Sequence, residues 1–172
     1  MYLLYLLLPL IRYHLMIRVL ACIRRAEQRG SVEYEGVHWL PSSEYHWTHD
    51  RQGPLPAGEA PRIYEAHIGM SSAEEKISSY REFATSVLPR IVALGYNCVQ
   101  LMAVMEHAYY ASFGYHVTNF FACSSRFGTP EEFKHLVDTA HGLGLRVIVD
   151  LVHSHACKNE GDGLGGTYKY GH

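Results

Sequence analysis

Residues 129–155 read TPEEFKHLVDTAHGLGLRVIVDLVHSH, and this stretch decides the fold class. Thr129 fits a helix N-cap, with Pro130 at the first helical position and Glu132 completing a capping box. The helix is expected to end in the glycines that precede the next apolar run. That run, residues 145–152, is typical of a strand that is buried on both faces of a parallel sheet.

The same alternation of strand and helix extends toward the N-terminus. Residues 62–67 (RIYEAH) and 97–102 (NCVQLM) are predicted to be two further strands. Between them, residues 72–94 carry apolar side chains at steps of three and four, which predicts a helix with a capping box at Ser72–Glu75. Pro89 inside this segment predicts a kink or an early break. Strands that alternate with helices favour a parallel α/β sheet with right-handed crossovers.

Three segments of different character divide the chain. Residues 1–30 open with the apolar run MYLLYLLLPLI, continue with scattered arginines and are left unassigned. The run is shorter than the about 20 residues that a membrane-spanning helix needs. A signal peptide stays open, because residues 19–22 resemble a lipoprotein cleavage site, but the basic region that precedes the apolar run of a signal peptide is missing. Residues 31–61 hold both tryptophans and are expected to be an extended lead-in whose aromatic side chains pin it to the following domain. Residues 62–172 form the α/β part, with a long loop at 103–127.

Composition and charge narrow the function classes. A formal net charge of -2 and 48% hydrophobic residues fit a globular protein and give no electrostatic argument for binding nucleic acid or an anionic membrane. The four cysteines are widely spaced and lack a C-x-x-C pair, which favours free thiols in a reducing compartment. The 13 tyrosines and 12 histidines supply side chains that can stack on sugars or hydrogen-bond to them.

Polar and aromatic residues gather after two of the predicted strands. The third strand ends in DLVHSH (150–155), and the second leads into MEHAYYASFGY (105–115). In a parallel α/β barrel, functional side chains lie at the C-terminal ends of the strands, so we expect a binding rim here. His153 and His155 share a strand face and suggest a metal pair, but no third ligand is evident, so no metal site is predicted.

These blocks resemble the α-amylase superfamily and, within it, the eukaryotic-type glycogen and starch branching enzymes. The resemblance covers most of the chain and rests on residues 62–69, 87–133, 136–159 and 162–164, with residues 32–49 similar to the family's lead-in. It implies an α/β fold that is a partial (β/α)8 TIM barrel. About the first three strands and two helices of that barrel would be present, after an irregular N-terminal lead-in.

The resemblance also implies an activity and a set of site residues. The activity would be that of a hexosyltransferase that cleaves α-1,4 and forms α-1,6 glucosidic linkages in glycogen, amylose or amylopectin, without a cofactor. Tyr115 would stack on the sugar at the cleavage subsite, His155 would hydrogen-bond the same sugar, and Asp150 would hold the active-site network. The family's nucleophilic Asp and acid/base Glu follow later strands, so no catalytic residue is expected here, and the polypeptide alone is expected to be inactive. The expected location is cytoplasmic or plastid.

Plainer interpretations of the same residues stay open. Asp150 could cap the following loop, Tyr115 could pack within its own loop, and His155 could be an ordinary rim histidine. Glu106 and His107 could form a general acid–base pair, although a structural loop hydrogen bond is favoured. The remaining aromatics of the long loop are interpreted as loop core: Tyr109, Tyr110, Phe113, Phe120 and Phe121.

Two other functional hypotheses remain beside the enzyme fragment. The chain could be a non-catalytic glucan-binding module that holds sugar without cleaving it. It could also be a gene-model fragment that does not fold stably, because a few strands of a barrel leave sheet edges open. Glycogen and starch cannot be told apart as substrates, since their linkage chemistry is shared.

Overall fold

The computed structural model describes three stretches of the chain: residues 22–25, 34–37 and 39–157. The apolar run that opens residues 1–30 and the resembling block at 162–164 therefore lie outside the described residues. The chain divides into two compact units. The sheet unit comprises residues 41–102 and 126–150, and the described residues of the loop unit are 22–25, 34–37, 39–40, 103–125 and 151–157.

Three parallel strands form the sheet of the sheet unit: β3 (Ile63–His67), β4 (Cys98–Met102) and β7 (Arg146–Val149). They lie in the order β3-β4-β7, so β4 is central and pairs in parallel with both neighbours. Val99 and Leu101 on β4 are fully buried, as expected for the central strand of a parallel sheet. The three predicted strands and their parallel arrangement are confirmed, but the third is shorter and less buried than predicted. β7 covers only four of residues 145–152, and of these four only Val147 is buried. The sheet is open and does not close into a barrel.

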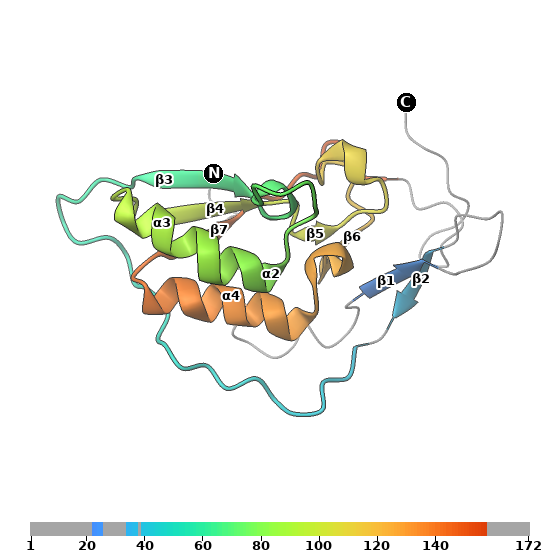
Figure 1. Cartoon of the computed structure of the whole chain (residues 1–172), viewed down its shortest axis with the longest axis horizontal. Helices are drawn as coiled ribbons and strands as arrows, with labels where there is room; N and C mark the ends of the chain where they lie inside the picture. The colour runs from blue at the N-terminus through green and yellow to red at the C-terminus, as the bar shows by residue number, and fades with distance from the viewer. Residues whose placement is uncertain (1–21, 26–33, 38, 158–172) are drawn as a thin grey trace. The chain divides into compact units, whose positions relative to one another are not determined.

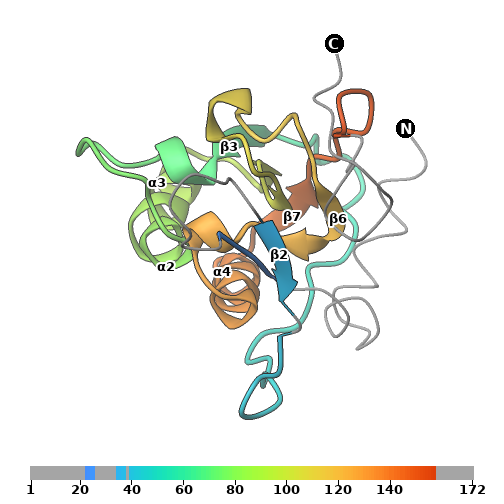
Figure 2. The same ribbon diagram turned by 90° about the vertical axis from the view of Figure 1, so that its right-hand side faces the viewer.

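The helices of the sheet unit lie on one face of the sheet. The first helical stretch runs through α2 (Tyr80–Glu82), the π-helical turn η2 (Phe83–Val87) and α3 (Leu88–Ala93), and the second is α4 (Pro130–Gly142). Figures 1 and 2 show α2, α3 and α4 together on the same side of the sheet. The helical residues that are almost fully buried include Tyr80, Phe83, Ala84, Leu88, Ile91, Leu136, Val137 and Ala140.

The start of α4 confirms the capping box predicted from the sequence. Thr129 is the N-cap, and its Oγ1 accepts the backbone N–H of Glu132 at 3.3 Å. The Glu132 carboxylate accepts the Thr129 N–H in return at 2.9 Å, and Pro130 occupies the first turn, where a missing N–H costs nothing. Arg81 Nε donates to Glu132 Oε1 at 2.7 Å, so the same carboxylate joins α4 to α2.

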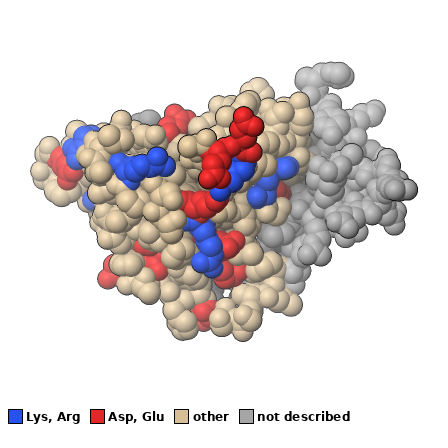
Figure 3. Space-filling model, in the orientation of Figure 1, with Lys and Arg blue, Asp and Glu red and all other residues tan. Residues whose placement is uncertain are grey.

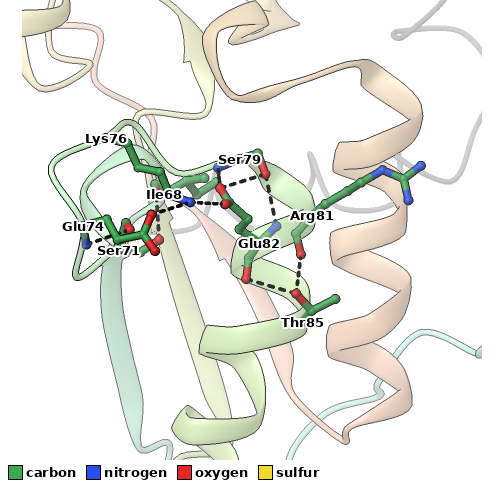
Figure 4. Close-up of polar contacts among 9 residues, drawn as sticks. Ile68, Ser71, Glu74, Lys76, Ser79, Arg81, Glu82 and Thr85 are labelled. Atoms are coloured by element: carbon green, nitrogen blue, oxygen red, sulfur yellow. Dashed lines mark hydrogen bonds and ion pairs between the residues drawn. The ribbon is translucent and has the colours of Figure 1, made fainter.

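The start of the first helix differs from the prediction. Helical structure begins at Tyr80, where Ser79 and Glu82 form the capping box, and not at Ser72. The Ser72 hydroxyl accepts only the nearby Glu74 N–H at 3.1 Å, which makes a local turn. Lys76 reaches over this turn to the Glu82 carboxylate at 2.6 Å (Figure 4). The predicted cap at Ser72–Glu75 was therefore wrong, because an equivalent Ser-x-x-Glu motif lies directly before the apolar face.

Pro89 does not end its helix. The chain continues as α3 through Ala93, but the turn that precedes Pro89, residues 83–87, is π-helical. Proline lacks the N–H that would bond four residues back, and a π-helical turn absorbs such an interruption without breaking the rod. The structure therefore shows the predicted irregularity as a local change of helix type.

The loop unit carries more structure than the long loop predicted at 103–127. β5 (Met105–Glu106) and β6 (Asn119–Cys123) pair antiparallel with a register shift, and the turn η3 (Tyr110–Ser112) lies between them. A further short turn, η4 (Ser125–Phe127), follows β6. β1 (Cys22–Arg25) pairs antiparallel with β2 (Tyr34–Val37). The sheet unit also contains the short turn η1 (Ile68–Met70).

The interpretation of the long loop's aromatics as loop core was largely wrong. Four of the five side chains are well exposed, with relative accessibilities between 39% and 57%: Tyr109, Phe113, Phe120 and Phe121. Within the short β6 ladder, the two phenylalanines follow each other, and the buried positions of that strand fall to the residues on either side of them. The sequence shows that these residues are apolar. It does not show which of them the tight η3 turn and the β5–β6 pair leave exposed to solvent.

The lead-in is extended, as predicted, and polar contacts with Asp138 hold it on α4. The buried Asp138 carboxylate accepts Thr48 Oγ1 at 2.7 Å and the Thr48 and His49 backbone N–H groups at 3.0 and 2.9 Å. The Tyr45 hydroxyl donates to the same carboxylate at 3.1 Å. Arg146 adds a second attachment by donating to Gly53 O at 2.7 Å. Hydrogen bonds to one buried carboxylate, more than aromatic packing, thus account for the attachment.

The described surface carries both signs of charge. On the face drawn in Figure 3, Lys and Arg side chains are interspersed with Asp and Glu. Pairs such as Lys76–Glu82 at 2.6 Å and Arg81–Glu132 at 2.7 Å account for part of this mixing. Among the described residues, no helix combines the length and the hydropathy needed to cross a membrane.

Asp138→Asn is expected to weaken the sheet unit in a pH-dependent way. Burial alone would raise the pKa of Asp138, but the hydrogen bonds from Thr48, His49 and Tyr45 outweigh it and lower this pKa from 3.8 to about 2. A lowered folded-state pKa stabilises the protein above the unfolded value of 3.8 and loses this contribution as the pH falls toward 2. At neutral pH the variant should lose about 2 kcal/mol of unfolding free energy.

Urea unfolding followed between neutral pH and about pH 2 measures this effect. The difference between the two proteins should shrink as the pH falls through the window below 3.8. Glu75→Gln, which changes an exposed carboxylate, is the control and should have little effect at any pH. An Asp138→Asn difference of constant size across this range would show that the charge of Asp138 is not what holds the lead-in.

Candidate functional site

Tyr115 lies at the end of a tight turn in the loop unit. Its backbone N–H donates to Ser112 O at 3.0 Å, and the Phe113 N–H donates to Tyr110 O at 3.0 Å. The Ser112 hydroxyl donates to Tyr109 O at 2.6 Å and closes the turn from its other side. Phe113 has a positive φ of 56°, which turns the chain sharply and leaves the Tyr115 ring 41% exposed.

His155 lies beside Tyr115 in the same unit. The two ring centroids are 6.1 Å apart, and the ring planes are inclined by 53°. The segment that carries His155 is attached through Cys157, whose backbone N–H donates to Val117 O at 2.9 Å and whose Sγ lies 3.5 Å from His116 O. The structure therefore brings together two of the three residues predicted to bind sugar, although they lie far apart in the sequence.

The Tyr115–His155 pair has the chemistry that a sugar ring requires. The faces of a pyranose ring carry apolar C–H groups, which can pack on an exposed aromatic ring, while its edges carry hydroxyl groups. An imidazole offers one nitrogen that donates and one that accepts when it is neutral, so His155 can bond a hydroxyl in either direction. Both side chains are exposed, and neither is buried as core. The sugar-binding roles of Tyr115 and His155 stay predictions.

Asp150, the third predicted residue, lies in the sheet unit. It follows β7 directly, and its backbone N–H donates to Leu101 O at 3.0 Å, which continues the β4–β7 ladder by one residue. Asp150 is half-buried at the C-terminal end of a parallel strand, the place where α/β barrels carry functional side chains. Its predicted role in an active-site network stays a prediction.

His67 is a polar residue at a strand end that the sequence reasoning did not single out. It is the last residue of β3, and its ring meets the Phe127 ring edge-on with centroids 5.9 Å apart. Burial lowers the pKa of His67, against a smaller opposing contribution from its backbone, so the imidazole is neutral at neutral pH. The sequence already indicated that His67 lies at a strand end, because RIYEAH places a histidine at the end of a predicted strand.

Glu106 and His107 hold the loop unit together. Glu106 is 3% exposed, and its Oε2 accepts the Ser125 N–H at 2.9 Å. Its backbone carbonyl accepts both the N–H and the hydroxyl of Thr118, at 2.8 and 2.9 Å. His107 is fully buried, and its Nδ1 lies 2.9 Å from Met105 O, so Nδ1 carries the proton. These contacts favour the structural interpretation of the pair over the acid–base one.

The described residues contain no group of three or more His, Cys, Asp or Glu side chains that could hold a metal ion. Cys98, Cys123 and Cys157 are free thiols. Burial raises the pKa of the Cys98 thiol, against a smaller opposing effect of Arg146, so this cysteine is protonated at neutral pH. It is a buried strand residue and not a reactive one.

Comparison with known proteins shows a consistent similarity to one group of enzymes. Residues 84–161 match the family model described as the alpha amylase catalytic domain. The chain is 55% identical to the 1,4-alpha-glucan-branching enzyme of Eremothecium gossypii over 90% of its own length and 24% of that protein. It is 63% identical to the 1,4-alpha-glucan-branching enzyme of Solanum tuberosum over 79% of its length and 16% of that protein. For the chloroplastic/amyloplastic enzyme of Oryza sativa the identity is 60%, over 87% of this chain and 18% of that one.

Among solved structures, a Salmonella typhimurium protein assigned as an alpha amylase matches 76% of this chain and 22% of its own, with a TM-score of 0.53 and 26% identity. The resemblance drawn from the sequence blocks is confirmed. The chain is homologous to part of the 1,4-alpha-glucan-branching enzymes and includes part of an alpha-amylase catalytic domain. It spans less than a quarter of the length of the relatives named here, between 16% and 24%.

Glu106→Gln tests the structural role of this carboxylate. The substitution keeps the shape but replaces one carboxylate oxygen with an amide NH2 group, which cannot accept a hydrogen bond, and this should cost about 1–3 kcal/mol of unfolding free energy for a buried group. Hydrogen exchange of the Ser125 amide, which donates to Glu106 Oε2, should become faster. Exchange of the Thr118 amide should change less, because it donates to the backbone carbonyl, which the substitution leaves in place.

Glu65→Gln, on an exposed position of β3, serves as the control for this measurement. Unchanged protection of the Ser125 amide in Glu106→Gln would contradict the structural role. A uniform loss of protection at Thr118 and Ser125 would indicate global destabilisation, and the specific role would then have to be abandoned.

Proposed function

We propose that the protein is a 1,4-alpha-glucan branching enzyme, which cleaves α-1,4 linkages and forms α-1,6 linkages, and that residues 1–172 contribute sugar contacts to it. The observation that carries this proposal is the exposed Tyr115–His155 pair, with ring centroids 6.1 Å apart, in a chain 54–63% identical to branching enzymes. The proposed substrates are glycogen, amylose or amylopectin. The proposed location is the cytoplasm or a plastid.

In this proposal β3, β4 and β7 are the first three strands of a (β/α)8 TIM barrel. Support comes from the strand order, since β3 and β7 each pair with β4 and leave their outer edges available for further parallel strands. Residues 31–61 are proposed as a linker before the barrel and residues 62–172 as its first part. Asp138 and Arg146 support this division, because both bind the linker from the α/β part.

Each of the proposed sugar contacts has a distinct role. Tyr115 stacks on the sugar at the cleavage subsite, His155 hydrogen-bonds its hydroxyl groups, and Asp150 holds the surrounding network. Retaining glycosidic chemistry needs two carboxyl groups about 5–5.5 Å apart. We assign no carboxylate of residues 1–172 to either role and propose that the nucleophile and the acid/base belong to another part of the enzyme. No organic cofactor and no metal enter this proposal.

A glucan-binding module without catalysis is the second candidate. The observation that favours it is the same exposed pair, because sugar binding by Tyr115 and His155 requires no carboxylate. The two candidates agree on how residues 1–172 bind and differ in what a longer form of the protein does. Branching by a protein that continues past His172 would favour the enzyme, and binding without branching would favour the module.

Residues 1–172 alone are expected not to branch amylose. The purified chain is incubated with amylose, and new α-1,6 linkages are counted as chain ends released by a debranching enzyme. The expected count equals that of a protein-free blank, because neither carboxylate of the catalytic pair is assigned to these residues. Turnover above the blank would place catalytic groups within residues 1–172 and would contradict the proposal.

Tyr115→Ala is expected to weaken the binding of maltoheptaose to the chain by about threefold to tenfold, the range that the loss of one aromatic contact gives. Calorimetric titration measures the affinity. Phe120→Ala is the matched control, since Phe120 is 39% exposed against 41% for Tyr115 and lies in the same unit. Equal affinity in wild type and Tyr115→Ala would contradict the stacking role. Absence of a cooperative thermal transition in the wild type would instead support the hypothesis of a fragment that does not fold.

A further inference from the structure

Two non-glycine residues among those described have a positive φ, and both lie in the segment that leads to Tyr115. Ala103 has a φ of 60° and Phe113 a φ of 56°. L-residues with a Cβ rarely adopt this left-handed conformation, because the Cβ crowds the following carbonyl. Such residues persist where the surrounding structure over-determines them. The neighbourhood of these two residues therefore shows what fixes the turn.

Gly114 provides the constraint. A Cβ placed on Gly114 would lie 2.5 Å from Ala103 Cα, 2.6 Å from Ala103 Cβ and 3.3 Å from Ala103 N. Two of these three atoms belong to the backbone, so no side-chain rotation could relieve the overlap. Both residues are buried, and Ala103 is 8% exposed. The turn is therefore packed backbone against backbone, at a distance that only glycine permits.

The contact determines the place of Tyr115, which follows Gly114 directly. The Tyr115 N–H donates to Ser112 O, and the Val117 N–H donates to Tyr115 O, both at 3.0 Å. The backbone of Tyr115 thus lies between two hydrogen bonds, while the residue before it rests against Ala103. A displacement of Gly114 away from Ala103 would carry the Tyr115 backbone with it.

His155 is attached at a point three residues beyond Gly114 in the chain. Its segment is attached by the bond from the Cys157 N–H to Val117 O at 2.9 Å. Val117 is 1% exposed and therefore firmly packed. Gly114 rests against Ala103, the His155 segment is attached at Val117, and Tyr115 lies between these two points. The separation of the two rings therefore depends on how closely Gly114 approaches Ala103.

We propose that the backbone contact between Gly114 and Ala103 positions the Tyr115 ring beside His155, which makes Gly114 a positioning residue for glucan binding. The binding part of this inference rests on the proposed function. The geometric part, the placement of one ring beside the other, does not depend on any ligand.

Gly114→Ala is the direct test, and Gly58→Ala is its matched control. Gly58 has a φ of 87°, against 86° for Gly114, and nothing lies within 4 Å of a Cβ placed on it. Both variants carry the same conformational cost of alanine at positive φ, but only Gly114→Ala also drives a methyl group into Ala103. Gly58→Ala therefore controls for the general destabilisation that alanine at positive φ causes.

The first measurement uses the unliganded chain. The NMR signals of the His155 ring sense the Tyr115 ring at 6.1 Å, and Tyr115→Ala defines their position when that ring is gone. In Gly114→Ala these signals should move toward the Tyr115→Ala position, whereas Gly58→Ala should leave them at the wild-type position. His155 signals that stay at the wild-type position in Gly114→Ala would overturn the proposal.

Ala103→Gly keeps the proposal testable if Gly114→Ala does not fold. This variant removes the methyl group against which Gly114 packs and places glycine at a φ of 60°, which glycine adopts without strain. The loosened contact should move the His155 signals part of the way toward the Tyr115→Ala position. His155 signals identical to those of the wild type would overturn the proposal, because the Ala103 methyl group that Gly114 packs against would then have no effect on the position of the Tyr115 ring.

The second measurement is the affinity for maltoheptaose. Gly114→Ala should weaken binding by about threefold to tenfold, as expected for a displaced aromatic contact, and Gly58→Ala by less than about twofold. Unchanged affinity in Gly114→Ala, in a chain whose wild type binds, would overturn the positioning role in binding. If the wild type does not bind, the proposed function fails, and the His155 signals still decide the geometric part.

Discussion

The central position of β4 is the constraint on which the rest of the sheet unit depends. β4 pairs in parallel with both β3 and β7, and parallel neighbours cannot be joined by a short hairpin. Each connection must cross over, and the chain crosses once through the helical stretch at residues 80–93 and once through α4. Val99 and Leu101 on β4 are fully buried, so these helices must present a continuous apolar face and begin at defined residues. The capping boxes at Ser79 and Thr129 set those beginnings.

The sequence predicts an element well where its signals are local and unique. Thr129 is followed by a proline and by Glu132, and no competing motif lies nearby, so the start of α4 was predicted to the residue. Three Ser-x-x-Glu motifs precede the other helix, at Ser71, Ser72 and Ser79, and local chemistry does not choose between them. The choice falls to Ser79 because Tyr80 then enters the core and Glu82 also binds Lys76. This information is tertiary, and a window of sequence does not contain it.

In the candidate site, too, some features follow from the sequence and others are visible only in the structure. The residues themselves, Tyr115, Asp150 and His155, follow from strand ends and from family resemblance. The contacts that place them do not, because Glu106 reaches Ser125 and Cys157 reaches Val117 across long separations in the sequence. The Gly114 contact with Ala103 is equally non-local, and a glycine in a loop gives no sign of what it approaches. His67 was missed for a different reason, since its strand-end position was visible but carried no recognised motif.

The buried carboxylates show what kind of chemistry the described residues can support. Glu106 and Asp138 are the buried carboxylates in the described part of the chain, and backbone N–H groups donate to both. Such donors stabilise the charged form, and in Asp138 they outweigh burial and lower the pKa to about 2. A glycosidic acid needs the opposite environment, one that raises the pKa so that a proton is available near neutral pH. Each carboxylate instead holds a segment of the chain in place. Asp138 binds the lead-in, and Glu106 binds the backbone of Ser125 in the loop unit. The polar and aromatic groups left exposed in the loop unit, Tyr115 and His155 among them, suit the holding of a sugar ring and not the breaking of its bond.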